Sequence, residues 1–166
     1  IKANEPLLPF CFIGDIGEVT ETQAKVAKAL ESSDCMDIWI PGDIIYPDGL
    51  SSSKDPQFNE KFLIPFSGVL NKNKRFFFIL GNHDYKGDPE SYIEIANQND
   101  SIIFPGNYFI HREEDICFVA LDTTIYDKIY MFYKRGEQIN WLKDNFNYLK
   151  ENCRLSIAVG HHPLFS

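Results

Sequence analysis

Side chains that can bind metal ions or transfer protons gather in four short clusters along this sequence. Each cluster follows a run of apolar residues, and a glycine stands directly before each one. Paired carboxylates repel one another unless a cation lies between them, and oxygen ligands combined with imidazole suit iron, manganese or zinc. The residue types therefore predict a metal centre. The clusters are Asp15, Asp43 with Tyr46, Asn82-His83-Asp84, and His161-His162.

The phenol of Tyr46, three residues after Asp43, narrows the choice of metal. A tyrosine with an ordinary pKa of about 10 binds as a phenolate only to a strongly acidic metal, and ferric iron fits best. A carboxylate can also bridge two metals, and metals about 3.5–4 Å apart form a clamp for in-line attack on phosphorus. The pattern therefore favours phosphoryl chemistry at a pair of metals.

Each of these residues also has a purely structural interpretation when it is taken alone. An Asp after Gly often caps a helix, Tyr46 could be a packed aromatic, and Asn82 could be a turn residue. Either His161 or His162 alone is more often a structural histidine than a ligand. The combination changes this balance, because a chance match to Gly-Asn-His-Asp is on the order of one in a thousand for such a chain.

Apolar runs of strand length precede the four clusters. Because helical patterns separate these runs, we expect βαβ units on a largely parallel sheet. In such sheets ligands gather beyond the carboxyl ends of the strands. Strands that run the same way would bring all four clusters to one edge. The runs are residues 9–13, 36–40, 76–80 and 155–159.

The segments between these runs show helical or hairpin patterns. Thr20 and Gln23 form a capping-box pattern that begins a helix. A stripe from Phe58 to Leu70 has helical spacing, although Pro65 must kink or interrupt it. Further helices are expected over 89–98 and over 136–151, the latter with Ile139, Leu142, Phe146 and Leu149 on one face, and a hairpin is expected from 107–111 and 116–121.

Composition excludes several classes of protein. The chain has 166 residues, of which 44% are hydrophobic and 24% charged, which is typical of a globular domain and excludes a disordered chain. A net charge of −8 argues against general binding to nucleic acid or to anionic membranes. No apolar run is long enough to span a membrane. A single phosphate substrate remains compatible, because a bound cation can invert the local charge.

The four cysteines do not form a metal-binding or redox motif. None of them has C-x-x-C spacing, which argues against a zinc ribbon or a thioredoxin-type site. Cys11 and Cys117 lie inside apolar runs and are interpreted as small buried hydrophobic residues. A disulfide between Cys35 and Cys153 is one pairing that the sequence leaves open. His111, in the expected hairpin, is interpreted as structural.

Taken in order, the motifs resemble those of the metallophosphoesterases. The tyrosine after Gly-Asp-x-x is similar to that of the purple acid phosphatases, closest to the small, tartrate-resistant type. The resemblance implies a calcineurin-like catalytic domain over residues 1–166. Its α/β fold would be a four-layer α-β-β-α sandwich, present mainly as the first sheet and its flanking helices. The motifs are Asp15-Ile16-Gly17, Gly42-Asp43-Ile44-Ile45-Tyr46, Gly81-Asn82-His83-Asp84 and Gly160-His161-His162-Pro163.

The resemblance also implies a set of metal ligands. Asp15 and Tyr46 would bind a ferric ion, and Asp43 would bridge it to a second metal. Asn82 and His161 would bind that second metal, a divalent Fe, Zn or Mn ion. A metal-bound or bridging hydroxide would attack phosphorus, and the metals would stabilise the charge on the phosphoryl oxygens.

Other residues would act on the substrate by the same resemblance. His83 would donate a proton to the leaving alkoxide or contact a phosphate oxygen, and Asn82 would also contact the substrate. Asp84 would orient and charge His83, as a carboxylate beside an imidazole does. His162 stands where the small family members commonly have Tyr, and it would either contact substrate at the pocket mouth or face solvent.

One family motif does not occur in the chain. The final Gly-His-x-His motif supplies one histidine to each metal, and we expect it soon after Ser166, within roughly another 80–150 residues. A first sheet without the remainder of the sandwich would leave an apolar face exposed, which soluble proteins avoid. The domain is therefore expected to be incomplete at its C-terminus.

The leading hypothesis is an acid phosphatase that hydrolyses phosphoric monoesters. Its substrate would be a small phosphorylated molecule or a phosphoprotein, with inorganic phosphate as product. One alternative is a phosphodiesterase or protein phosphatase with an Mn or Zn pair on the same fold. A second is an inactive scaffold or anchoring protein, and a third is a small binding module. By resemblance, the compartment would be secreted, lysosomal or periplasmic.

Overall fold

The computed structural model describes residues 9–127 and 132–163, and in it two β-sheets lie face to face between helices. The first sheet is entirely parallel, and the second joins an antiparallel hairpin to a parallel strand. The first sheet has the order β1 (Phe10–Phe12), β2 (Asp37–Pro41), β3 (Arg75–Ile79) and β4 (Ile102–Ile103), and the second has the order β5 (Phe109–Glu113), β6 (Ile116–Ala120) and β7 (Leu155–Val159).

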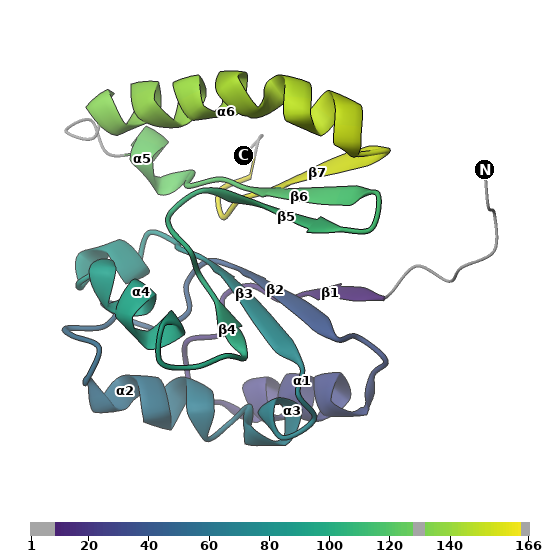
Figure 1. The fold of residues 1–166 in the computed structure, drawn as a ribbon. Helices are drawn as coiled ribbons and strands as arrows, with labels where there is room; N and C mark the ends of the chain where they lie inside the picture. Colours follow the sequence, from purple (N-terminus) through teal and green to yellow (C-terminus); the bar gives the residue numbers. More distant parts are fainter. Residues whose placement is uncertain (1–8, 128–131, 164–166) are drawn as a thin grey trace.

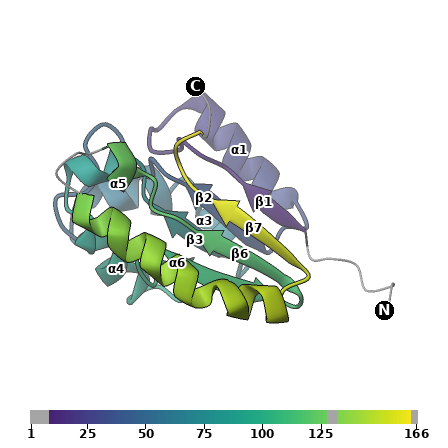
Figure 2. The same cartoon turned by 90° about the horizontal axis from the view of Figure 1, so that it is seen from above.

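Helices cover the outer faces of both sheets, which gives the four-layer α-β-β-α arrangement expected from the motifs (Figure 1). Seen from above, the axis of α6 lies roughly along β6 and β7, and the helix runs in the opposite direction to these strands (Figure 2). The helices are α1 (Glu21–Ser32), α2 (Pro56–Phe58), α3 (Ser67–Leu70), α4 (Glu90–Ala96), α5 (Thr124–Asp127) and α6 (Phe132–Asn152). Among the described residues, none of the helices combines the length and apolarity that crossing a bilayer requires.

The expected strands all form, but they do not all belong to one sheet. Residues 155–159 form β7 in the second sheet, next to β6, and not a fourth strand beside β1–β3. The chain therefore holds three strands of the second sheet, and these cover the inner face of the first sheet. The expectation of a bare apolar face is wrong for the strands that carry Trp39 and Phe77, because both side chains are fully buried.

Aromatic rings fill the space between the two sheets. The Trp39 ring of β2 stacks on Phe77 of β3 with centroids 4.5 Å apart, and on Phe118 of β6 at 4.9 Å. On the other face of the first sheet, Phe62 packs edge-to-face on Phe76 and Phe78. Successive side chains of β3 thus point to opposite faces of the sheet, as the period of two in a strand requires, and contribute to the packing on both faces.

The helical predictions are confirmed with local differences. Thr20 caps α1 by accepting a hydrogen bond from the Gln23 backbone at 3.0 Å. The Gln23 side chain does not close the box, because its amide donates instead to the carbonyls of Ile16 and Lys61. The stripe from Phe58 widens into a π-helical turn over Asn59–Leu63, and Pro65 separates that turn from α3 as expected.

The apolar residues whose spacing indicated α6 are not all buried. Leu149 is buried, but Ile139 is 41% exposed and Phe146 is 62% exposed. The side chains that meet the second sheet are Trp141, Leu142 and Leu149, which pack with Cys117 and Val119. Helical spacing identified the helix but not which of its side chains face the sheet. The short elements β4 and α5 were not predicted, because two to four residues carry no measurable periodicity.

All four cysteines form disulfides, which corrects both interpretations made from the sequence. Cys11 of β1 pairs with Cys35, which follows α1, and Cys117 of β6 pairs with Cys153, which follows α6. Each bridge therefore fastens a strand to the end of a helix that covers the same sheet. Sequence alone could not choose among the pairings, since the partners are 24 and 36 residues apart.

Replacing Cys117 and Cys153 together by Ala is expected to lower the free energy of unfolding by about 3–4 kcal/mol, because the open chain gains loop entropy. Urea unfolding measured with the other bridge intact checks this value. Non-reducing peptide mapping provides the independent test. Recovery of a Cys35–Cys153 peptide in place of the two bridges above would contradict the structure.

Candidate metal centre

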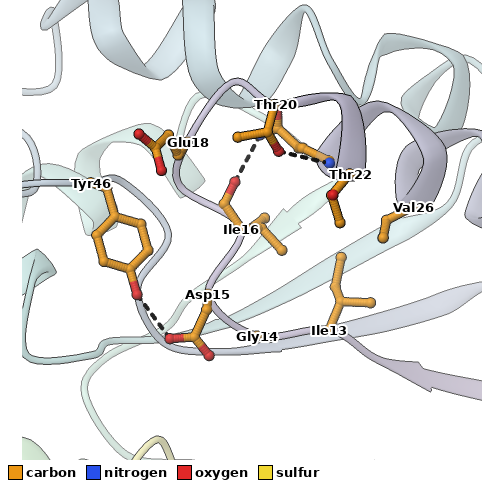
Figure 3. Close-up of a pocket in the computed structure, with 10 residues that line it drawn as sticks. Ile13, Gly14, Asp15, Ile16, Glu18, Thr20, Thr22, Val26 and Tyr46 are labelled. Carbon is orange, nitrogen blue, oxygen red and sulfur yellow. Dashed lines mark hydrogen bonds between the residues drawn. The ribbon is translucent and has the colours of Figure 1, made fainter.

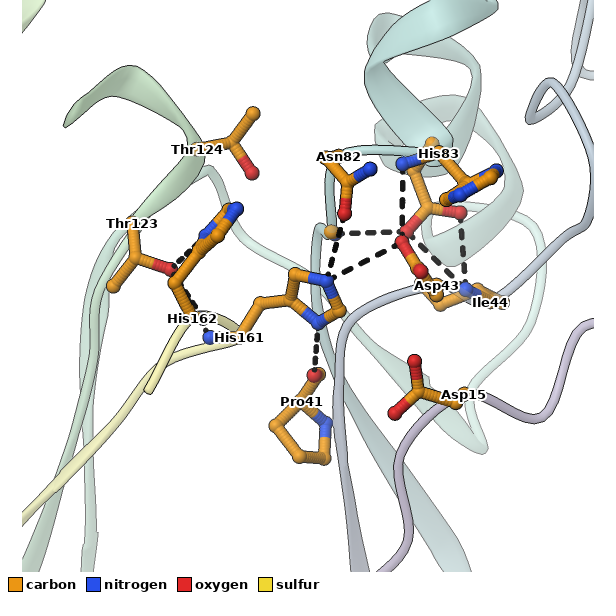
Figure 4. A network of polar contacts seen from close by, with 12 residues as sticks. Asp15, Pro41, Asp43, Ile44, Asn82, His83, Thr123, Thr124, His161 and His162 are labelled. Carbon is orange, nitrogen blue, oxygen red and sulfur yellow. Dashed lines mark hydrogen bonds and ion pairs between the residues drawn. The ribbon is translucent and has the colours of Figure 1, made fainter. Parts of the chain in front are cut away.

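Four loops bring oxygen and nitrogen ligands together at the carboxyl ends of the strands (Figure 4). Asp15 follows β1, Asp43 follows β2 and Asn82 follows β3, whereas His161 follows β7 of the opposite sheet. One ligand atom each from Asp15, Asp43 and His161 lies within 4.8 Å of the other two. The convergence expected from the sequence is found, but two sheets supply it and not one.

The backbone holds both aspartates in an unusual conformation. Asp15 and Asp43 have φ values of 55° and 53°, in the left-handed region. Aspartate tolerates this region better than most residues, and such strain is typical of functional sites. Gly81 leaves room for the result, because a Cβ there would lie 2.2 Å from Oδ1 of Asp43. Close approach likewise explains Gly42 and Gly160, where a Cβ would lie 2.3 Å from His161 and 2.6 Å from Thr123, but not Gly14, whose nearest contact would be 3.7 Å.

One side of Asp43 faces the phenol of Tyr46. The Tyr46 hydroxyl lies 2.6 Å from Oδ2 of Asp43 and 2.9 Å from Oδ1 of Asp15. Burial and the two neighbouring carboxylates raise the pKa of this phenol. One hydroxyl proton is therefore shared between two carboxylates, and three oxygens crowd around a point where a cation could replace that proton.

The other side of Asp43 faces the imidazole of His161. Nδ1 of His161 lies 2.9 Å from the carbonyl of Pro41, while Nε2 lies 3.0 Å from Oδ1 of Asn82 and 3.5 Å from Oδ1 of Asp43. A neutral imidazole has only one N–H, so these contacts cannot all be hydrogen bonds. If Nδ1 donates to the Pro41 carbonyl, as metal-bound histidines commonly do to a backbone carbonyl, the lone pair of Nε2 points toward oxygens that also carry lone pairs.

The donor set therefore fits two cations, one on each side of Asp43. Asp15 and Tyr46 with Oδ2 of Asp43 form the first group, and Asn82 and His161 with Oδ1 of Asp43 form the second. Both groups combine oxygen with at most one imidazole, which suits iron, zinc or manganese. In the absence of cations the like charges of Asp15 and Asp43 would repel one another, with only the one Tyr46 proton between them.

His83 lies beside this group but belongs to neither side of it. Its ring meets the Tyr46 ring with centroids 4.5 Å apart. Nδ1 of His83 contacts the carbonyl of Pro47 and lies 3.0 Å from Nζ of Lys86. The backbone N–H of His83 donates to Oδ1 of Asp43 at 3.0 Å, so this residue also helps to hold the central carboxylate.

Asp84 does not orient His83, contrary to the sequence-based expectation. Its carboxylate is fully buried and accepts hydrogen bonds from the backbone of Ile44, Ile45 and Gly81 and from the Tyr92 hydroxyl. Burial, partly offset by these donors, raises the pKa of Asp84 to about 6. Asp84 therefore joins the loop after β2 to the loop after β3 from below the site.

Thr123 was not assigned a role from the sequence, yet it positions both histidines of the last cluster. Its hydroxyl accepts from the backbone N–H of His161 and of His162, at 3.1 and 2.9 Å. It also lies 2.9 Å from Nδ1 of His162. Gly160 leaves room for Thr123, because a Cβ there would lie 2.6 Å from the Thr123 methyl.

Asp122 links the two sheets next to the site. The Tyr85 hydroxyl donates to its carboxylate, and its backbone N–H and carbonyl pair with the side-chain amide of Gln138. Burial raises the pKa of Asp122. The loop of the second sheet that carries Thr123 is thereby fixed relative to the loop after β3.

A second group of potential metal ligands lies at the opposite end of the strands. Asp37, His111 and Glu113 present ligand atoms within 4.8 Å of one another. Arg75 already supplies positive charge there, because its guanidinium donates two hydrogen bonds, of 2.7 and 2.8 Å, to Asp37. We therefore interpret this group as an ionic contact between the sheets, in keeping with the structural role expected for His111.

Comparison with known proteins gives a consistent result. A family model described as calcineurin-like phosphoesterase matches residues 8–166. Purple acid phosphatase 17 of Arabidopsis thaliana is 30% identical over 95% of this chain and 52% of its own length. Tartrate-resistant acid phosphatase type 5 of Mus musculus is 24% identical over 99% of this chain and 58% of its own length. The chain thus spans about half the length of these curated relatives.

A solved structure shares the fold. It is described as "GAP50 the anchor in the inner membrane complex of Plasmodium" and superposes with a TM-score of 0.80 at 22% identity. The superposition covers 95% of this chain and 55% of the other. At this identity the likeness concerns the fold alone.

Replacing Asp84 by Asn is expected to lower the free energy of unfolding by about 2–3 kcal/mol, because an amide nitrogen would face backbone N–H donors in a buried position. The folded-state pKa of about 6 lies above the ordinary value of 3.8, so the folded state binds more protons between these values. Stability contributed by this group therefore falls as pH rises from about 4 to 6. The variant should lose that pH dependence.

Urea unfolding at several pH values between 4 and 7, in the presence of a chelator, measures both effects. The exposed Asp144 of α6 provides the control, and Asp144→Asn should leave the free energy of unfolding within about 0.5 kcal/mol of the starting value. A fully stable Asp84→Asn protein would contradict the role assigned to this carboxylate.

Proposed function

Because the chain belongs to the calcineurin-like phosphoesterase family, we propose that the protein hydrolyses phosphoric monoesters with a ferric ion and a divalent Fe, Zn or Mn ion. The observation that carries the proposal is the position of Asp43, whose two carboxylate oxygens face Tyr46 on one side and His161 on the other. A carboxylate that bridges two metals must present one oxygen to each of them, as Asp43 does here. Similarity to purple acid phosphatases supports the choice of metals.

The proposed ligands divide between the two ions. Asp15, Tyr46 and Asp43 would hold the ferric ion, and Asp43, Asn82 and His161 would hold the divalent ion. When bound, such ions stabilise negative charge on the phosphoryl oxygens and lower the pKa of a water molecule. The phenolate of Tyr46 favours ferric iron, because burial and the adjacent carboxylates raise the pKa of the free phenol.

The protein's own groups would handle the substrate and the proton. Nδ1 of His83 is occupied by the Pro47 carbonyl and the Lys86 ammonium, so Nε2 is the ring nitrogen that would hold a proton and give it to the leaving oxygen. The Asn82 amide would contact the phosphoryl group. His162 would contact the substrate at the pocket mouth. Asp84 is left out of this proton transfer, because its carboxylate is occupied by buried donors.

The disulfides support a proposal for the compartment. Two bridges fasten strands to helices, and such bridges persist in oxidising environments. A secreted, lysosomal or periplasmic protein would meet that condition.

Two other functions use the same fold. A phosphodiesterase or protein phosphatase with an Mn or Zn pair would not need the Tyr46 phenolate. An anchoring protein would need no metals at all, and one solved chain of this fold is described as an anchor. The donors that surround Asp43 favour the hydrolase, since an anchor gains nothing from holding two carboxylates side by side.

The intact protein is expected to contain iron and to show a visible phenolate-to-iron band. Replacing Tyr46 by Phe should abolish the band and weaken ferric binding by about 100-fold, since a direct ligand is lost. Elemental analysis beside the visible spectrum measures both. The exposed Tyr126 serves as the control, and Tyr126→Phe should retain the colour.

The outcomes separate the three functions. A colourless, fully metallated and active protein would refute the ferric centre and favour the Mn or Zn alternative. A protein that binds no metal would favour the anchor.

Replacing His83 by Gln is expected to lower kcat for an alkyl ester such as glycerol 2-phosphate by about 10²–10³-fold, because the leaving alkoxide needs a proton. Turnover of p-nitrophenyl phosphate should fall by less than about tenfold, since nitrophenolate leaves without one. Steady-state kinetics on both esters, at equal metal content, give the comparison. Equal losses for the two esters would exclude His83 as the proton donor.

A further inference from the structure

Two neighbouring cavities flank the proposed metal ligands and share one wall. The first has a volume of about 400 Å³ and reaches Asp15 and the start of α1, while the second has a volume of about 500 Å³ and extends toward Pro47 and Lys61. Glu18 and Tyr46 line both cavities, and Figure 3 shows them together at one end of the first. Volumes of this size suit small ligands, so these cavities are where a leaving group would lie.

Glu18 brings uncompensated negative charge to this place. It is exposed on the loop between β1 and α1, and it forms no hydrogen bond or ion pair with any residue that the structure describes. Two other carboxylates of the same loop and helix start have partners: Glu21 pairs with Lys25 at 2.7 Å, and Asp15, which also lines the first cavity, accepts from the Tyr46 hydroxyl at 2.9 Å.

The one lysine that lines the second cavity does not neutralise Glu18. The Lys61 ammonium donates to the Tyr46 carbonyl and, at 2.6 Å, to Oε1 of Gln57. These bonds hold it against the loop after β2. The charge of Lys61 still faces the second cavity. The described lining of the first cavity includes Asp15 and Glu18 but no lysine or arginine, so a ligand on that side of Glu18 meets no competing protein cation.

Much of the surface beside Glu18 is apolar or aromatic. Tyr46 lines both cavities, Val26 lines only the first, and Val19, which is 62% exposed, lines only the second together with Pro47 and Lys61. A carboxylate beside apolar and aromatic surface matches an alkylammonium group, which is attracted to negative charge and to ring faces. An anionic leaving group would be repelled by Glu18. An uncharged, sugar-like leaving group would gain nothing from either Glu18 or Val19.

We propose that Glu18 is a specificity-determining residue that selects phosphoric monoesters of amino alcohols, whose leaving group carries a positive charge. The proposal rests on the monoesterase function above and extends it to a substrate class. The phosphoryl group would lie at the metals, and the alkylammonium would lie between Glu18 and the Tyr46 ring, which line both cavities. Selection then depends on one side chain that takes no part in binding the metals.

The test compares phosphocholine with 3,3-dimethylbutyl phosphate, its uncharged isostere, on the intact metal-loaded protein. The starting protein should show a kcat/KM about five- to tenfold higher for phosphocholine. Glu18→Gln should reduce that ratio to about one while the kcat/KM for the uncharged ester stays the same. Raising the salt concentration should also shrink the ratio, because this charge is exposed.

Glu21→Gln is the matched control. Glu21 lies three residues further along, is paired with Lys25 and lines neither cavity, so this variant should keep the ratio of the starting protein. Equal turnover of the two esters by the starting protein, or a ratio that survives Glu18→Gln, would overturn the specificity proposal and leave the monoesterase function standing. No turnover of either ester or of p-nitrophenyl phosphate would overturn the proposed function and this inference with it.

Discussion

The carboxylate of Asp43 is held beside a second carboxylate, that of Asp15, and the surrounding loops keep the two like charges together. The Tyr46 phenol and Asp15 lie on one side of Asp43, and Nε2 of His161 lies on the other. Left-handed backbone at Asp15 and Asp43 directs the two carboxylates toward each other. Below them, the buried Asp84 gathers backbone N–H groups from both loops. The Asp84 carboxylate is thus satisfied by fixed donors, and the Asp43 carboxylate above it stays available for cations.

The site depends on the packing of the two sheets as much as on its loops. Asn82 belongs to the first sheet and His161 to the second, so their distance of 3.0 Å is set by how the sheets stack. Trp39 fixes that stacking through its contacts with Phe77 and Phe118. Near the site, Tyr85 and Asp122 connect the sheets, and at the far end Arg75 and Asp37 approach Glu113 and His111. A shift of one sheet would therefore separate the two halves of the donor set.

Much of this arrangement could be predicted from the sequence, because strand ends and glycines mark where the chain turns. The convergence of Asp15, Asp43, Asn82 and His161 followed from four apolar runs that end alike. What the runs could not show was their distribution between two sheets, since a buried strand has the same pattern in either. The exposed Phe146 and the disulfide partners were missed for a related reason: helical rotation and cysteine pairing are decided by contacts between segments distant in sequence.

The run Gly81-Asn82-His83-Asp84 shows why adjacency in sequence is a poor guide to partnership. At a tight turn after a strand, consecutive side chains point in different directions. Gly81 gives space to Asp43, Asn82 turns toward His161, His83 packs against Tyr46, and Asp84 points into the core. A carboxylate next to a histidine suggested an ion pair, but the turn that presents His83 to the site also carries Asp84 away from it. Four contiguous residues are needed because one turn must serve four directions at once.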